Sequence, residues 1–81
     1  STLGIIASSH KLEAARVTIN LTISSDTNNY NIQSNRGGTY SSGNTDLTLT
    51  INSGVVVGST SASNPALETG SSWATGDTIT I

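Results

Sequence analysis

Few side chains in this sequence have types suited to catalysis, and they do not stand at a recognised catalytic spacing. His10 is the only residue suited to general acid–base chemistry near neutral pH, and Glu13 is its nearest carboxylate. No glycine-framed nucleophilic serine accompanies them, so we interpret His10 as a surface residue near the start of a helix. The sequence therefore predicts no catalytic residues and a protein that is not an enzyme.

Three aspartates, Asp26, Asp46 and Asp77, carry the oxygen ligands that Ca²⁺ prefers, but they are scattered at the ends of expected strands. No D-x-[DN]-x-[DN]-G loop is present, and roles in turns and caps account for such residues. The Arg36-Gly37-Gly38 stretch lacks the lysine and the hydroxyl of a phosphate-binding loop. We therefore predict neither a metal site nor a cofactor.

The three aromatic residues are the remaining candidates for a binding role. Tyr30, Tyr40 and Trp73 lie in segments rich in Asn, Ser and Gly, which we expect to be loops. Sugar-binding sites often combine an aromatic face with neighbouring amides, and binding residues often lie on loops of a rigid scaffold. We predict these three side chains as candidate contacts with a receptor or glycan. Anchoring of a core or an interface is the competing role, because the rings carry much of the surface that can be buried.

The strands that position these loops are indicated by strict alternation of aliphatic and polar residues. Residues 17–24 and 47–52 alternate between an aliphatic residue and a short neutral hydroxyl or amide. Period-2 alternation places one set on each face of a strand, so the aliphatic sets should share one core. Such a polar face, with Thr, Asn and Ser in place of Lys or Glu, suits packing against other strands or binding sugars.

Shorter elements are expected between and after the two regular strands. We predict strands near 30–33, at 55–57, where apolar residues on both faces indicate burial, and at 77–81. Pro65 excludes a central strand from its loop. The predicted fold class is all-β, either a small β-sandwich or a trimeric intertwined β-structure, with at most one short helical turn near residues 9–16.

The expected organisation is an N-terminal apolar segment and turn at 1–16, followed by a β module at 17–81. The last strand stops at Ile81 in the middle of its pattern, so we expect the module to continue beyond that residue. Ser1 before Thr2 is consistent with a native N-terminus left by removal of the initiator methionine.

Composition excludes several classes of partner. The net charge is −2, and the three basic residues are not clustered, which disfavours nucleic acid and anionic membrane. No apolar run has the length of a membrane span, and no signal peptide opens the chain. Ser, Thr and Asn supply 35 of 81 residues, cysteine is absent, and large aliphatic residues number only 18. So small a core without disulfides predicts stabilisation by oligomerisation.

The second half of the chain resembles bacteriophage tail-fibre and tail-tip proteins. The similarity lies in residues 49–60, which read LTINSGVVVGST, in the PALETG of residues 65–70, and in the GDTITI of residues 76–81. The corresponding family pattern is T-I-N-S-G-V-V-I-G-S-T-S followed by P-A-L-x-T-G and a G/S-x-T-[VI] strand. The family also carries a glycine-rich tract, which would begin where this sequence stops.

The resemblance implies a β-rich module, a homotrimer of identical chains, in the virion tail and extracellular after release. Its partners would be other tail proteins and a host surface glycan or outer-membrane protein. From the residues alone, a self-assembling subunit, such as a capsid decoration protein or a filament protomer, is an alternative function. A monomeric carbohydrate-binding module is a third.

Overall fold

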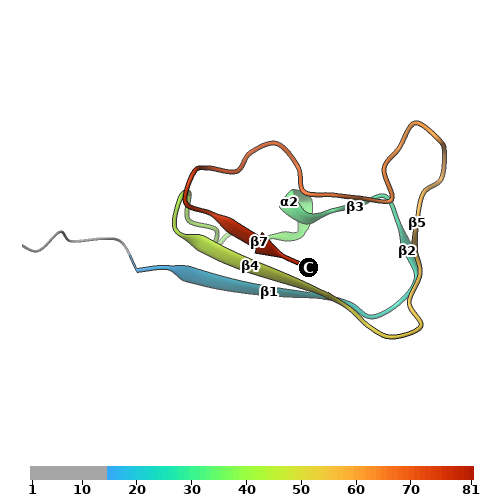
Figure 1. The fold of residues 1–81 in the computed structure, drawn as a ribbon, viewed down its shortest axis with the longest axis horizontal. Helices are drawn as coiled ribbons and strands as arrows, with labels where there is room; N and C mark the ends of the chain where they lie inside the picture. The colour runs from blue at the N-terminus through green and yellow to red at the C-terminus, as the bar shows by residue number, and fades with distance from the viewer. Residues whose placement is uncertain (1–14) are drawn as a thin grey trace, which may run out of the picture.

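The computed structural model describes residues 15–81, which form seven strands and one short helix. Figure 1 shows two long strands beside each other, with a loop-rich side facing them. The strands and the helix are β1 (Val17–Ile23), β2 (Thr27–Asn28), β3 (Tyr30–Asn31), α2 (Ile32–Asn35), β4 (Thr45–Ile51), β5 (Val57–Gly58), β6 (Leu67–Glu68) and β7 (Thr78–Thr80).

All strand pairs within residues 15–81 are parallel. The strands form a three-stranded sheet in the order β1-β4-β7 and two small sheets, β2-β5 and β3-β6. The chain therefore winds in coils, and each coil lays its strands beside those of the coil before (Figure 1). This is the topology of a parallel β-helix, with β1 to β3 in the first coil, β4 to β6 in the second, and β7 opening the third.

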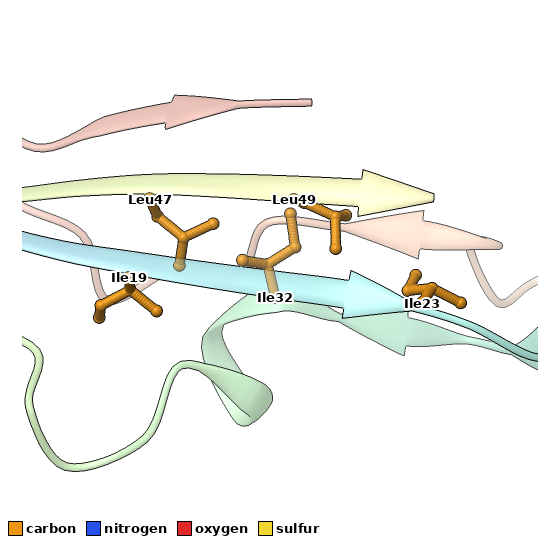
Figure 2. Packing of buried hydrophobic residues seen from close by; sticks show 5 residues of the cluster. All are labelled: Ile19, Ile23, Ile32, Leu47 and Leu49. Carbon is orange, nitrogen blue, oxygen red and sulfur yellow. The ribbon is translucent and has the colours of Figure 1, made fainter. Parts of the chain in front are cut away.

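The aligned register of the long strands builds the core. Ile19 pairs with Leu47, and Leu21 pairs with Leu49, so residues of like character lie side by side across the sheet. The buried cluster consists of Ile19, Ile23, Ile32, Leu47 and Leu49 (Figure 2). Figure 2 shows Ile32 reaching toward this sheet from the loop-rich side. The prediction that the aliphatic sets of both strands share one core is confirmed.

The outer face of the sheet carries rows of small polar residues. Asn20, Thr48 and Thr80 form one row across β1, β4 and β7, and all three side chains are exposed. Thr22 and Thr50 are aligned in the next row and are exposed as well. Because polar and aliphatic residues alternate in the same phase in β1, β4 and β7, one face of this sheet is polar and the other is apolar.

The opposite side of each coil is held by turns and by the helix. Asn31 caps α2, and its side-chain oxygen accepts a hydrogen bond of 3.1 Å from the backbone N–H of Ser34. The helix has only four residues, and its first residue, Ile32, is fully buried. Burial of Ile32 against the sheet therefore fixes where this short helix lies.

The all-β fold class predicted from the sequence is confirmed. A sandwich would pack two separate sheets, mostly of antiparallel strands, whereas these strands stack in parallel as coils of one chain. Stacking is favoured because β1 and β4 present the same side-chain types at aligned positions. The helical turn was expected near residues 9–16, most of which lie outside the described residues. Within residues 15–81, the helix lies at 32–35.

Two expectations for the shorter elements need correction. The strand near 30–33 ends at Asn31, because that residue caps α2. The segment 55–57 is not a buried strand: only Val57 pairs, and Val56, just before β5, is 62% exposed. The loop around Pro65 is followed by β6, whose two residues pair with β3. The strand predicted at 77–81 is confirmed as β7.

Candidate functional site

Two of the three predicted aromatic contacts meet in one cluster on the loop-rich side. The rings of Tyr40 and Trp73 lie edge to face, with centroids 5.3 Å apart and planes at 88°. The Arg36 guanidinium carbon lies 3.6 Å from the centroid of Tyr40 and 4.7 Å from that of Trp73. We call these three residues the aromatic–arginine cluster. Arg36 therefore covers one face of the Tyr40 ring and leaves less of it for stacking with a sugar.

Polar atoms of the same cluster hold the segment 69–77 in place. The indole Nε1 of Trp73 donates to the carbonyl of Thr69 at 2.7 Å, and Arg36 Nη1 donates to the carbonyl of Ser72 at 2.7 Å. The Tyr40 hydroxyl donates to Asp77 Oδ2 at 2.5 Å. This bond, with some desolvation, raises the pKa of Tyr40. These contacts join the loop after α2 to the loop before β7, so the cluster has a structural role.

The third aromatic residue lies elsewhere. Tyr30 is in β3, pairs with Leu67 of β6, and packs partly buried against the core. Partial burial raises the pKa of its hydroxyl. The prediction grouped Tyr30 with Tyr40 and Trp73 because all three stand in polar segments, but the only close ring pair among residues 15–81 is Tyr40–Trp73.

The predicted aspartates have structural partners. Asp26 Oδ1 accepts from the backbone N–H of Val56 at 2.8 Å and so fixes a turn. Asp77 accepts from the backbone N–H groups of Thr45 and Ala74 in addition to Tyr40. Desolvation pushes the pKa of Asp77 up, but these hydrogen bonds outweigh it, and the pKa lies below the ordinary value. Asp77 thus connects β4 with the start of β7.

Asp46 belongs to an ion pair at the start of the sheet. Arg16 Nε and Nη2 each donate to a carboxylate oxygen of Asp46 at 2.8 Å, and Arg16 Nη2 also donates to the carbonyl of Gly76 at 2.7 Å. Hydrogen bonds from Arg16 and from the Thr78 hydroxyl lower the pKa of Asp46 to about 2. No group of three or more His, Cys, Asp or Glu side chains suited to a metal ion occurs within residues 15–81.

A polar pocket of about 450 Å³ lies beside the aromatic–arginine cluster, and sequence reasoning did not find it. It is lined from two coils, since α2 and β6 are far apart in the chain but adjacent in the structure. The only sequence signal was Asn31 three residues before Ser34, a weak helix-cap pattern. The lining residues are Asn31, Gln33, Glu68, Thr69, Gly70 and Ser71.

The pocket is held rigid by hydrogen bonds between its own residues. Gln33 Oε1 accepts from the backbone N–H groups of Ser71 and Ser72 at 2.7 and 2.8 Å. Asn31 Nδ2 donates to Glu68 Oε1 at 2.7 Å, so a carboxylate and an amide from neighbouring coils are tied together. The site can therefore offer hydrogen-bond donors and acceptors in fixed positions to a small polar ligand.

The described residues thus form a stacked parallel β-structure whose loop-rich side carries polar side chains. The family model described as phage tail fibre adhesin Gp38 matches residues 18–81, and the chain belongs to this family. The tail-fibre resemblance is thus confirmed, and it extends over the first coil, where the sequence pattern had shown nothing definite. Neither a curated protein nor a solved structure matches the chain. Within the described residues, no helix is long and apolar enough to cross a membrane.

Proposed function

We propose that this chain is a non-enzymatic adhesion module of a phage tail fibre or tail tip that supports recognition of the host surface. The observation that carries the proposal is the adhesin family match, which covers the same residues that form the stacked coils. The match favours this function over a capsid decoration protein or a filament protomer. The module would reside in the virion tail, where it contacts other tail proteins and the host cell.

Two features support assembly with further protein. Within residues 15–81, the β1 and β7 strands each have a neighbour on one side only, so each presents an edge to another strand. Val56, just before β5, is 62% exposed, so a further chain could cover its aliphatic side chain. Identical chains are the partners we propose, as a homotrimer. Native mass spectrometry tests this, because a folded monomer at micromolar concentration would contradict it.

The aromatic residues enter the proposal with different roles. Trp73 is partly exposed and remains a candidate contact with a host glycan, whereas Tyr40 is covered by Arg36 and Tyr30 packs against the core. Trp73→Ala should therefore weaken attachment directly or through the loop that it braces. Tyr40→Phe keeps the ring and removes the hydrogen bond to Asp77, so it should leave attachment close to that of the parent.

Competition for adsorption tests the function. The purified full chain is added to susceptible bacteria before a phage that carries it, and the fraction of phage that adsorbs is measured. We expect the chain to lower adsorption in proportion to its concentration, or, if it is a connector, to bind tail-fibre protein from the same phage. A chain that neither blocks adsorption nor binds any tail protein would contradict the proposal.

A further inference from the structure

We propose that the pocket between α2 and β6 is a binding site for a neutral hexose, which it holds through two adjacent ring hydroxyl groups. This inference rests on the proposed adhesin function and names the ligand class of the site. The pocket volume of about 450 Å³ lies within the range of small-molecule sites and suits one or two sugar rings. All six lining residues are glycine or carry uncharged polar groups, apart from the single carboxylate of Glu68.

Gln33 supplies fixed donors. Its side-chain oxygen accepts two backbone hydrogen bonds, from Ser71 and Ser72, so the orientation of the planar amide is determined. The amide nitrogen must then point to the other side of the plane, away from those two N–H groups. Gln33 therefore presents N–H donors in a direction that the protein sets before a ligand binds, which lowers the ordering cost of binding.

Glu68 supplies the complementary acceptor. One of its oxygens accepts from Asn31, and an ionised carboxylate has about four lone-pair positions, so capacity remains for a hydroxyl donor. Two adjacent hydroxyl groups of a sugar can donate to this carboxylate and accept from the Gln33 amide. A hydrogen bond to an ionised acceptor is stronger than one between neutral groups, so Glu68 should contribute most of the affinity.

Gly70 allows the pocket to have this shape. Its φ of +96° is one that residues with a side chain rarely adopt, and a Cβ at this position would collide with the side chain of Gln33. The glycine thus lets Gln33 lie directly on the backbone of the 69–72 segment. Trp73 and Arg36 hold the same segment through the carbonyls of Thr69 and Ser72, so they act as positioning residues for the pocket.

Charge sets the expected selectivity. The pocket lining contains Glu68 and no lysine or arginine, so an acidic sugar would meet a like charge with no cation among the lining residues. Neutral hexoses avoid this repulsion and still offer hydroxyl pairs. We therefore expect galactose, glucose or N-acetylglucosamine to bind in preference to N-acetylneuraminic acid.

Titration followed by NMR of the backbone amides tests the site in the full chain. Each of the four sugars is added separately, up to tens of millimolar. We expect saturable shifts for the amides of residues 69–72 with at least one neutral hexose and at least tenfold weaker binding of N-acetylneuraminic acid. Absence of saturable shifts with all three neutral sugars, or equal binding of the acidic one, would overturn the proposal.

Two nearly isosteric variants identify the atoms. Gln33→Glu keeps an oxygen for Ser71 and Ser72 but replaces the donor, and Glu68→Gln keeps an oxygen for Asn31 but removes the charge. Each should raise the Kd at least tenfold, whereas the control Asp26→Asn removes an exposed charge outside the pocket and should leave the Kd unchanged. Should Gln33→Glu fail to fold, Glu68→Gln alone decides, and a parental Kd for it would overturn the site.

The same variants separate this inference from the adhesin function. If Glu68→Gln loses sugar binding but competes for adsorption as the parent does, the pocket binds sugar without serving attachment, and the link to the proposed function is overturned. If the parent neither binds a neutral sugar nor shifts at residues 69–72, yet still blocks adsorption, the pocket proposal fails and the adhesin function stands.

Discussion

The three-stranded sheet and the loop-rich side of this molecule are built by different interactions. In the sheet, residues of like type align between the seven-residue strands β1 and β4, and burial of Leu47 and Leu49 supplies the stability. On the loop-rich side, the strands have two residues each, and single side chains such as Gln33 and Arg36 form hydrogen bonds with backbone groups of distant loops. The sheet therefore provides a scaffold of regular repeats, whereas the loop-rich side is shaped by contacts that are not repeated from coil to coil.

The largest effect should come from the apolar face of the sheet. Leu49 is 1% exposed, so Leu49→Ala removes buried apolar surface and leaves a cavity in a small core. We expect a loss of about 2–5 kcal/mol in the free energy of unfolding, measured by urea denaturation. A loss below about 1 kcal/mol would mean that the sheet is not the main source of stability.

Acid should weaken the junction where the sheet meets the loop side. The folded-state pKa of Asp46 is lowered to about 2, below that of an unfolded aspartate, so its ion pair stabilises the protein above about pH 4. This contribution is lost as the pH falls from about 4 to about 2. Asp46→Asn should flatten the decline of unfolding free energy over this window. An identical decline in the variant would contradict the assignment of this acid sensitivity to Asp46.

The aromatic–arginine cluster should contribute less than the core and should act locally. Arg36→Ala removes a guanidinium stacked on Tyr40 and a hydrogen bond to Ser72, and cation–π contacts at exposed sites contribute about 0.5–1 kcal/mol. We expect a change of this size together with a weaker near-UV circular dichroism signal from Trp73. Arg36→Lys keeps the charge without the planar group and serves as the control. An unchanged signal in Arg36→Ala would mean that the cluster does not order this loop.

The smallest effect is expected on the polar face of the sheet. Thr48 is exposed between Asn20 and Thr80, so Thr48→Ala should change the unfolding free energy by no more than about 0.5 kcal/mol. A much larger loss, accompanied by a change in mass under native conditions, would place this face in an interface between chains.

The sheet could be predicted from the sequence to a greater extent than the loop side. Alternation in residues 17–24 and 47–52 identified the strands and their buried faces, because the period of two depends only on local geometry. It did not identify parallel pairing, since the same alternation suits an antiparallel sheet. The similar patterns of Ile19 to Ile23 and Leu47 to Ile51 are an internal repeat, and this was the overlooked signal for stacked coils.

The pocket could not be predicted because its members come together only through coil stacking. Gln33 and Ser71 are distant in sequence and have no motif spacing, and Glu68 resembles any surface carboxylate. The aromatic residues stood out by type, but their type did not reveal that Arg36 covers Tyr40. Val56 was assigned to a buried strand on hydrophobicity alone, yet it is exposed and lies just before β5.

The scaffold forms by parallel pairing of strands within one chain. Disulfide cross-linking tests this pairing most directly. The chain has no cysteine, and Thr22 and Thr50 are aligned, exposed neighbours in β1 and β4. Neighbouring strands lie about 4.8 Å apart, a separation that a disulfide can span. Thr18 pairs with Asp46, so it lies far from Thr50 in this register but would face it in an antiparallel pair centred on Asn20 and Thr48.

We predict that oxidation of the Thr22→Cys, Thr50→Cys variant gives a cross-linked product with the mass of one chain. The Thr18→Cys, Thr50→Cys variant should keep free thiols under the same conditions. Cross-linking of the second variant instead of the first, or a product with the mass of two or three chains, would contradict the parallel single-chain scaffold.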